Sequence, residues 1–247
     1  MSCNNQNNEI FSRFTMMLNE NQIKNLFSAR IIVFGVGGVG GSVAHMLVRS
    51  GIQHIGIVDF DIISISNVNR QLVANMSNIG KLKVDELEKQ IFELSPNTKV
   101  TKYPFKLDVN TINVIDFSNF DYIVDCIDDV NAKKLLIKKA KELNIPILCA
   151  MGAGNRYAEI PNFEITDISK TSYDKLAKII RKFCSEVRIN KLQVCYTKQK
   201  SLKFDCKSIG SVVYYPINMA SVMCSKVIND ILKWGNNYGF IGFWRNY

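Results

Sequence analysis

The feature that most constrains the fold is a glycine-rich turn between a strand-like and a helix-like stretch, IIVFGVGGVGGSVAHMLVRSGI. Its apolar, β-branched start is typical of a buried strand. Gly35-x-Gly37-x-x-Gly40 follows directly, and the residues after it place apolar side chains on one helical face. Glycines permit a tight turn and leave room for a phosphate, which the free N–H groups at a helix start attract. The pattern predicts a nucleotide site, and alone it suits NAD and ATP equally.

The first two-thirds of the chain alternates between strand and helix patterns, which predicts an α/β fold with a Rossmann-like, doubly wound, mainly parallel sheet. We expect strands at residues 31–34, 55–58, 99–103, 122–127 and 145–150, and helices at 39–50, 81–94 and 132–143. The last of these helices is rich in lysine, which we assign to its outer face. Extra C-terminal strands are expected at 163–168 and 192–197, and further helices at 173–183 and 217–234.

We find no linker long enough to separate two independent domains. We therefore expect one domain over residues 1–247. It has a nucleotide-binding half at about 20–152 and a basic, substrate-binding half at about 153–235, because the pattern changes near residue 152.

The net charge of +9 is concentrated in one segment. Residues 170–207 hold 11 Lys or Arg against 3 Asp or Glu, whereas the remainder holds 20 against 19. Such a segment is typical of a polyanion-binding surface, and an ordinary solvated basic face is the alternative. The expected helix within it carries the candidate phosphate contacts Lys175, Lys178, Arg181 and Lys182.

Several classes of protein are disfavoured by composition. No run of 18 apolar residues and no signal-peptide pattern is present, so we expect a cytoplasmic protein without stable membrane insertion. Seven scattered cysteines form no C-x-x-C pair, which predicts reduced thiols and no zinc site. The two histidines, His45 and His54, are interpreted as structural. The aromatic tail, residues 238–247, suits packing on the protein or its partner, or peripheral contact with a membrane surface.

Polar residues after the second strand favour ATP over NAD. Asp59 ends that strand, where an acidic residue accepts hydrogen bonds from ribose hydroxyls. Arg70 offers a planar fork for phosphate oxygens, and Lys83 adds a point charge. Asp128 follows the buried strand in YIVDCIDDV, at the sheet edge where ligands bind. A carboxylate among phosphates requires a cation, so Asp128 implies Mg²⁺. Taken singly, Arg70 and Lys83 also suit surface charges, and Asp128 suits a helix N-cap.

As a set, these motifs resemble the ubiquitin-activating, ThiF/MoeB-type superfamily, whose members adenylate a carboxylate with ATP and magnesium. The resemblance implies a phosphate-binding turn, a ribose-binding Asp59, phosphate contacts from Asn67, Arg70 and Lys83, and a magnesium ligand at Asp128. The matching residues are Gly35, Gly37, Gly38, Gly40, Asp59, Asp61, Ser66, Asn67, Arg70, Gln71, Lys83, Asp125 and Asp128. Within the turn, we expect an added side chain to be most damaging at Gly37 and Gly38.

The branch of the superfamily is indicated by further stretches, RF at Arg13, AMGAGNR at residues 150–156 and ITDISKT at residues 165–171. These resemble the tRNA threonylcarbamoyladenosine dehydratase family. The resemblance implies ATP-dependent cyclisation of that modified adenosine beside the anticodon, a homodimer, and an arginine, here Arg13, reaching the partner's site. It also leaves room for a sulfur-relay or other tRNA-modification partner.

Two alternatives remain on the sequence alone. The first is adenylation of the C-terminus of a ubiquitin-like or sulfur-carrier protein, although the paired C-x-x-C zinc motifs common in that branch are missing. The second is a noncatalytic NAD-binding module, which the glycine turn by itself also suits.

Overall fold

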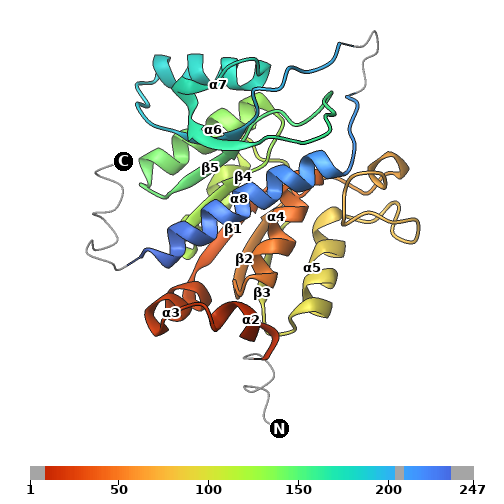
Figure 1. The fold of residues 1–247 in the computed structure, drawn as a ribbon, viewed down its shortest axis with the longest axis vertical. Coiled ribbons are helices and arrows are strands. Elements are labelled where there is room, and N and C mark those ends of the chain that lie inside the picture. Colours follow the sequence, from red (N-terminus) through yellow and green to blue (C-terminus); the bar gives the residue numbers. More distant parts are fainter. Residues whose placement is uncertain (1–8, 204–208, 235–247) are drawn as a thin grey trace.

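The computed structural model describes residues 9–203 and 209–234 (Figure 1). Its centre is a seven-stranded sheet with the order β3-β2-β1-β4-β5-β7-β6. All neighbouring strands pair in parallel except β6, which runs antiparallel to β7. The strands are β1 (Arg30–Phe34), β2 (His54–Val58), β3 (Lys99–Tyr103), β4 (Tyr122–Asp125), β5 (Ile147–Ala150), β6 (Glu164–Asp167) and β7 (Gln193–Tyr196). The predicted α/β class with extra C-terminal strands is therefore confirmed.

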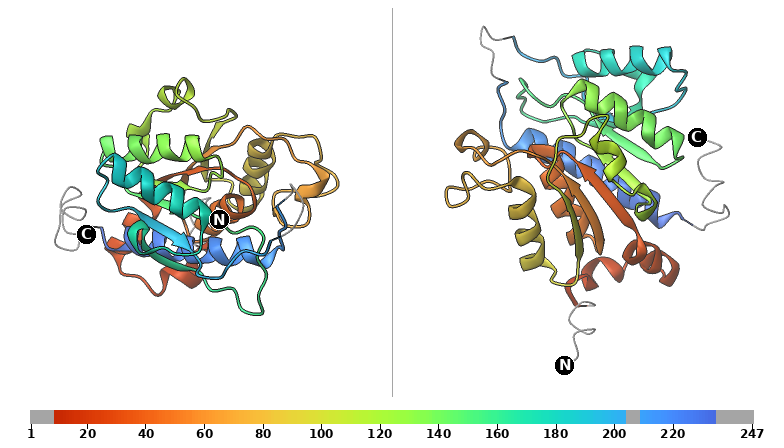
Figure 2. Two further views of the ribbon diagram at one scale, coloured as in Figure 1. Left: turned by 90° about the horizontal axis from the view of Figure 1, so that it is seen from above. Right: turned by 180° about the vertical axis from the view of Figure 1, so that it is seen from behind.

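Helices cover both faces of this sheet (Figure 2). They are α2 (Ser12–Thr15), α3 (Glu20–Ser28), α4 (Gly38–Arg49), α5 (Lys83–Leu94), α6 (Val130–Glu142), α7 (Lys175–Glu186) and α8 (Tyr214–Leu232). Short 3₁₀ turns are η1 (Ile65–Asn67), η2 (Thr111–Val114), η3 (Phe117–Asn119) and η4 (Ile168–Lys170). Helices α3, α4, α5 and α8 share one hydrophobic core, whereas α6 and α7 belong to the other.

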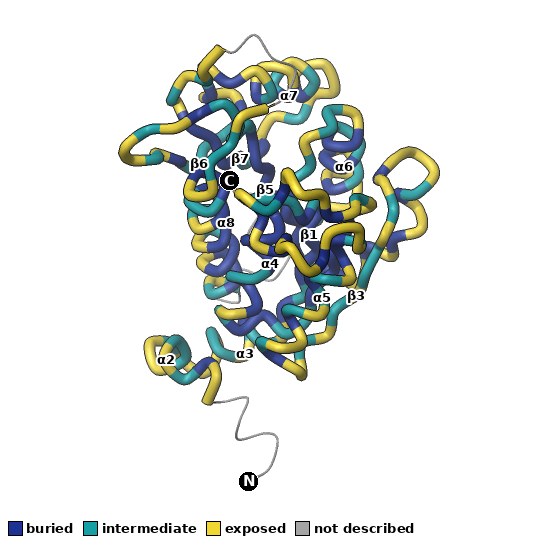
Figure 3. Tube along the Cα trace, turned by 90° about the vertical axis from the view of Figure 1, so that its right-hand side faces the viewer, coloured by how far each residue is buried: buried dark blue, intermediate teal, exposed yellow. Residues whose placement is uncertain are grey.

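Alternation along the strands explains the two cores. In β1, Ile31 and Val33 face the core of α4 and α8, while Ile32 and Phe34 face the core of α6 and α7. Because both faces are covered, the central strands are buried along nearly their whole length, as Figure 3 shows. This double burial is the reason that these strands are predominantly apolar in sequence.

Most predicted elements form within two or three residues of their expected bounds. Strand β4 ends at Asp125, before the expected residue 127, because the Asp125 carboxylate accepts a hydrogen bond from Ile127 N at 3.0 Å and turns the chain. Helix α8 begins at Tyr214 rather than at 217, since Pro216 lies in its first turn, where proline is tolerated. Helices α2 and α3 were not predicted.

None of the described helices is long and apolar enough to cross a membrane. The aromatic tail at residues 238–247 and the end of the basic segment at residues 204–207 lie outside the described residues. The split into two halves at residue 152 stays a prediction.

Candidate active site

The glycine turn joins β1 to α4 at the carboxyl edge of the sheet. Gly35 has a φ of +78°, which favours glycine, and its N–H donates to Val58 O at 2.8 Å. A Cβ on Gly40 would lie 1.8 Å from Gly35 O, and one on Gly35 would lie 2.8 Å from Cys126 O. Within the protein itself the closest contacts would therefore arise at Gly40 and Gly35, whereas the expected damage at Gly37 and Gly38 concerns a bound nucleotide and stays a prediction. A Cβ on Gly37 meets only Gln71, at 3.7 Å, and one on Gly38 would lie 3.2 Å from Arg70 O.

A cavity of about 1170 Å³ lies over this turn. The predicted site residues that line it are Gly35, Gly37, Gly38, Gly40, Asp59, Asp61, Asn67, Arg70, Gln71, Lys83, Asp128 and Lys175. The predicted residues outside its lining are Arg13, Ser66, Lys178, Arg181 and Lys182. The structure thus brings together residues that are spread over more than half of the sequence.

Asp59 is held at the end of β2 by two backbone N–H groups. Its Oδ2 accepts from Val36 N and its Oδ1 from Asp61 N, both at 2.8 Å. Burial raises the pKa of the Asp59 carboxyl, while these donors and the charge of Lys83 act in the opposite direction. Its carboxylate therefore faces the cavity in one fixed orientation, as a ribose-binding aspartate requires.

Lys83, at the start of α5, is largely buried and is paired with a carboxylate. Its Nζ lies 2.6 Å from Asp61 Oδ2, and its backbone N–H donates to Asp61 O. The two residues therefore hold each other at the cavity wall, which both of them line. The alternative that Lys83 is an ordinary surface charge does not fit its 6% side-chain exposure.

The segment around η1 supplies polar residues to the cavity wall. Asn67 is buried, and its side-chain oxygen accepts from Ser64 N at 3.1 Å. Arg70 Nη1 donates to Ser66 O at 2.6 Å, which explains why Ser66 supports the arginine without lining the cavity itself. Gln71 is 7% exposed, and its Oε1 is a buried acceptor without a partner among the described residues. An unsatisfied buried oxygen in a cavity wall is consistent with a ligand that donates to it.

Asp128 and Asp129 have different roles. Asp129 is the N-cap of α6, where its carboxylate accepts from Asn131 N and Ala132 N. Asp128 is exposed to the cavity and makes no hydrogen bond or ion pair within the described ranges 9–203 and 209–234. The N-cap alternative therefore applies to its neighbour, and the Asp128 carboxylate is left available for a cation.

Sequence analysis missed a buried ion pair formed by Lys133 and Asp125. Lys133 Nζ lies 2.7 Å from Asp125 Oδ2, and neither side chain is exposed. Burial alone lowers the pKa of Lys133, yet the charge of Asp125 holds it above the ordinary value. The assignment of all the α6 lysines to the outer face is wrong for Lys133, which shares a helical face with Leu136, Ile137 and Ala140. That spacing was the available signal.

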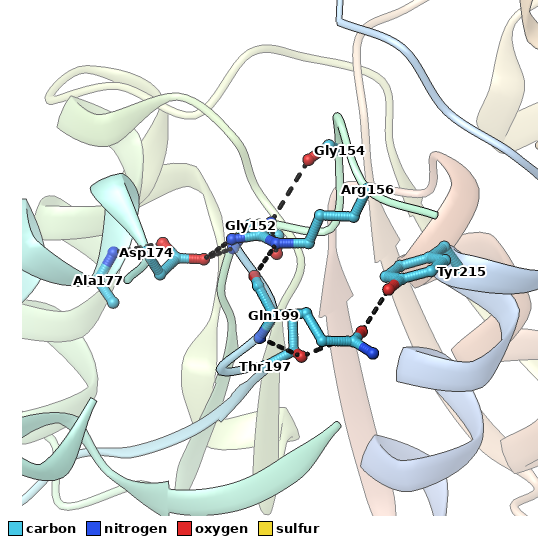
Figure 4. Close-up of polar contacts among 8 residues, drawn as sticks. All are labelled: Gly152, Gly154, Arg156, Asp174, Ala177, Thr197, Gln199 and Tyr215. Carbon is cyan, nitrogen blue, oxygen red and sulfur yellow. Dashed lines mark hydrogen bonds and ion pairs between the residues drawn. The ribbon is translucent and has the colours of Figure 1, made fainter. Parts of the chain in front are cut away.

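A second missed pair, Arg156 and Asp174, also lines the cavity. Figure 4 shows the polar contacts of this pair. Arg156 Nη2 lies 3.2 Å from Asp174 Oδ2, and both side chains are nearly inaccessible. The same guanidinium donates to Gly152 O at 2.6 Å and to Gln199 O at 2.8 Å. Arg156 therefore holds together the loop that the AMGAGNR stretch forms, which sequence alone did not indicate.

The basic residues of α7 divide into two groups. Lys178 and Lys182 are exposed, and Lys175 reaches the cavity. Arg181 is half-buried, and its Nη1 donates to both the carbonyl and the hydroxyl oxygen of Thr171, at 2.8 and 2.7 Å. Arg181 thus has an internal task, and the other three residues are the better candidates for an outside partner.

Cys126 is the one cysteine lining the cavity among the described residues. Burial raises the pKa of its thiol far above the usual range, so it stays protonated and is a poor nucleophile. Burial also lowers the pKa of His45 and His54, and neither lines the cavity. The described part of the site therefore suits charge neutralisation rather than covalent catalysis.

A cavity that combines a glycine turn, a ribose-type aspartate and facing cations is typical of nucleotide-using enzymes. The model of the ThiF family matches residues 11–238. The chain belongs to the ThiF family. The superfamily resemblance of the sequence motifs is therefore confirmed.

Particular ThiF-type relatives match to different extents. The chain is 34% identical over 193 residues to the tRNA threonylcarbamoyladenosine dehydratase of Bacillus subtilis (strain 168), which covers 78% of this chain and 76% of that protein. It is 36% identical over 134 residues to the adenylyltransferase and sulfurtransferase UBA4 of Saccharomyces cerevisiae (strain YJM789), which covers 54% and 30%. Its fold is similar to the crystal structure of the E. coli dehydratase TcdA in complex with ATP. The TM-score is 0.86 at 24% identity, over 94% of this chain and 97% of that chain.

Proposed function

We propose that this ThiF-family protein is an ATP-dependent tRNA threonylcarbamoyladenosine dehydratase, which cyclises the threonylcarbamoyl side chain of the modified adenosine beside the anticodon. The observation that carries this proposal is the extent of similarity to a named dehydratase. The match of 193 residues is longer than the nucleotide-binding half and therefore includes part of the basic half. That named relative supplies the substrate class, and the cavity described above supports the chemistry.

The chemistry requires activation of a free carboxylate, which is a poor electrophile. A carboxylate oxygen of the substrate attacks the α-phosphorus of ATP, and the bond to pyrophosphate breaks. An internal nucleophile of the same side chain then attacks the activated carbonyl, closes the ring and releases AMP. The net change in the nucleoside is the loss of one water. Such a sequence needs positioning and charge neutralisation and no enzyme nucleophile, in agreement with the protonated Cys126.

We assign the nucleotide contacts from the residues around the cavity. Asp59 accepts from the ribose hydroxyls, and the N–H groups at the start of α4 face the phosphates. Arg70 and Lys83 supply positive charge to the phosphates, and Asn67 and Gln71 supply polar contacts from the same wall. Asp61 orients Lys83 through its 2.6 Å contact. We assign the Gln71 Oε1 to a donor of the bound substrate, because this atom has no partner in the described protein.

Magnesium fits this site as a partly coordinated ion. The described residues include no cluster of three or more His, Cys, Asp or Glu side chains that could hold a metal. Mg²⁺ commonly takes one or two carboxylates and completes its shell with phosphate oxygens and water. Asp128 would hold the ion, which when bound neutralises the charge on the phosphates.

We propose that α7 contacts the tRNA and that the active form is a homodimer. Lys175, Lys178 and Lys182 present charge to the solvent beside the cavity, which suits contacts to phosphate without reading of sequence. Arg13 lies in α2, which joins α3 at the amino end of β1, away from the cavity (Figure 1). Its expected role therefore requires the cavity of a second subunit.

The alternative is adenylation of a ubiquitin-like or sulfur-carrier protein, as the UBA4 match suggests. That match spans 134 residues, about the length of the nucleotide-binding half alone. None of the seven cysteines forms a C-x-x-C pair. Both observations favour the tRNA substrate.

The deciding experiment is nucleoside analysis of tRNA that contains threonylcarbamoyladenosine, after incubation with the enzyme and ATP. The expected product is the nucleoside lighter by one water, formed together with AMP in equal amount. Omission of ATP is the control and should leave the nucleoside unchanged. An unchanged nucleoside in the complete reaction, with AMP formed only when a carrier protein is added, would favour the alternative.

A further inference from the structure

Tyr173 is an exposed aromatic side chain at the rim of the cavity. It is 64% exposed, and Lys200 Nζ lies 4.9 Å from the centre of its ring. Neither residue lines the cavity, but each is followed directly by one that does, Asp174 and Ser201. The pair therefore stands at the edge of the space where the modified adenosine would enter.

The backbone at Tyr173 is held in an unusual conformation. Tyr173 has a φ of +56°, a left-handed conformation that is unfavourable for a bulky residue. Asp174 fixes the next position, because Oδ1 accepts from Ala177 N at 2.8 Å and Oδ2 from Gly152 N at 3.0 Å. The ion pair of Asp174 with Arg156 adds a third anchor to the same carboxylate (Figure 4). Strained backbone positions that neighbouring contacts hold in place cluster at functional sites, and Tyr173 is such a position next to the cavity.

We propose that Tyr173, with Lys200 against its ring, is the stacking platform for an unpaired RNA base next to the modified adenosine. This inference rests on the proposed function. Proteins recognise single-stranded loops by stacking splayed bases on aromatic side chains, and every base offers a π face. Lys175, next but one along the chain, and Lys178 add positive charge, which suits an RNA rather than a protein segment. Because Lys200 covers part of the ring while 64% stays exposed, room remains for a base.

Two substitutions at this position separate stacking from a structural role. Tyr173→Gly removes the ring and also relieves the left-handed backbone, so a merely structural tyrosine predicts equal or higher thermal stability and unchanged RNA binding. Stacking predicts instead that affinity for an anticodon stem-loop RNA falls by about tenfold or more. Tyr173→Phe keeps the ring and should bind as the wild type does. The shift in Tm produced by ATP should be the same in all three proteins.

The salt dependence of RNA binding gives a second readout. The binding constant K for RNA falls as salt rises, and this fall is plotted as log K against log salt. If Lys200 contacts a phosphate, Lys200→Ala is expected to reduce the magnitude of the slope by about one. If Lys200 contacts only the ring and the base, the slope should stay unchanged. Either result fits the platform when the loss in Lys200→Ala is smaller than in Tyr173→Gly. Equal affinity of Tyr173→Gly and wild-type protein would overturn the proposal.

An RNA lacking one base supplies the pairwise test. Removal of the base that stacks should weaken binding to wild-type protein and have no effect on binding to Tyr173→Gly. If removal of each loop base in turn has the same effect on both proteins, the platform assignment is wrong.

Phe92→Ala is the matched control for loss of an exposed aromatic. Phe92 is 61% exposed near the far end of α5 and does not line the cavity. Its removal should leave RNA affinity unchanged, and a loss as large as that of Tyr173→Gly would overturn the specific role of Tyr173. Dehydration by the wild-type enzyme is measured in parallel. If the wild type forms the lighter nucleoside but Tyr173→Gly binds RNA normally, only this inference fails.

Discussion

Lys133 and Asp125 form a fully buried ion pair at the carboxyl ends of β4 and β5, with 2.7 Å between Nζ and Oδ2. The ammonium group also donates to Ala150 O at 3.1 Å, and the second carboxylate oxygen accepts from Ile127 N at 3.0 Å. One pair thus joins α6, β4 and β5 and fixes the turn that leads to Asp128. Buried charges of this kind are tolerated when they are paired and hydrogen-bonded.

Lys133→Met is expected to destabilise the protein by about 3–5 kcal/mol, because it leaves the Asp125 carboxylate buried without a counter-charge. Chemical denaturation measures this loss. Lys138→Met in the same helix is the control, since Lys138 is 63% exposed and its substitution should cost no more than about 0.5 kcal/mol. Adding Asp125→Asn to Lys133→Met should recover part of the loss, and an additive double mutant would contradict the pairing.

The same pair shows what sequence analysis could predict and what it could not. Periodicity identified α6 and β4, because each buries an apolar face and the pattern is local. Periodicity did not predict that Lys133 pairs with Asp125. A charged residue on an apolar helical face indicates a buried charge, but the sequence pattern does not identify the residue that neutralises it. The Arg156–Asp174 pair was missed for the same reason, because its members are 18 positions apart in the sequence.

The predictable part of the site has a common physical cause. The glycine turn, Asp59 and Asp128 each follow a strand that pairs in parallel, so their positions at one sheet edge follow from the fold class. The tolerance of each glycine to an added side chain could not be predicted from the fold class, because it depends on atoms from other segments of the chain. The neighbour of Gly35 is Cys126, more than 90 residues along the chain.

Gly40→Ala is expected to destabilise the fold by about 3 kcal/mol or more, since the new Cβ would lie 1.8 Å from Gly35 O. Gly37→Ala should leave stability within about 1 kcal/mol of the wild type, because its Cβ meets only ordinary contacts. It should nevertheless weaken ATP binding, as the methyl group intrudes on the phosphate side of the turn. Unfolding curves and ATP titrations of both variants check this, and equal stability of the two would refute the geometric argument.

Asp128→Ala should reduce AMP formation by at least about a hundredfold while leaving stability unchanged, because the carboxylate has no partner in the described protein. Asp129→Ala is the neighbouring control. It should cost about 1 kcal/mol of stability, since Asp129 caps α6, and retain measurable activity. Turnover is measured with tRNA and ATP over a series of magnesium concentrations. Normal turnover by Asp128→Ala would exclude the assigned magnesium role.

The raised pKa of Asp59 gives a pH prediction. Burial disfavours the ionised Asp59 carboxylate, so ionisation of this group destabilises the folded protein. This destabilisation is absent below the ordinary pKa of 3.8 and grows as the pH rises through the raised pKa of the folded protein. The pH dependence of nucleoside binding has the opposite sign: affinity increases as the pH rises, because the ionised carboxylate is the better acceptor for ribose hydroxyls. Affinity for adenosine, which has no titrating phosphate, should therefore fall on acidification at a pH above 3.8. Asp59→Asn should bind adenosine weakly, and its affinity should not change over this pH range. If the affinity of that variant still falls on acidification, a group other than Asp59 is responsible.

Arg13 is expected to act in the partner's cavity, so two inactive variants should restore activity when mixed. Arg13→Ala lacks the reaching arginine, whereas Asp128→Ala lacks the proposed magnesium ligand in its own cavity. In a mixed dimer, the cavity of the Arg13→Ala subunit keeps Asp128 and receives Arg13 from the partner, while the other cavity lacks both. If subunits exchange at random in an equal mixture, about half of the dimers are mixed and each has one intact cavity, which gives about a quarter of wild-type activity. AMP formation by the mixture, compared with each variant alone, measures the recovery. A mixture as inactive as its components, with subunit exchange verified by mass spectrometry, would show that Arg13 does not complete the partner's site.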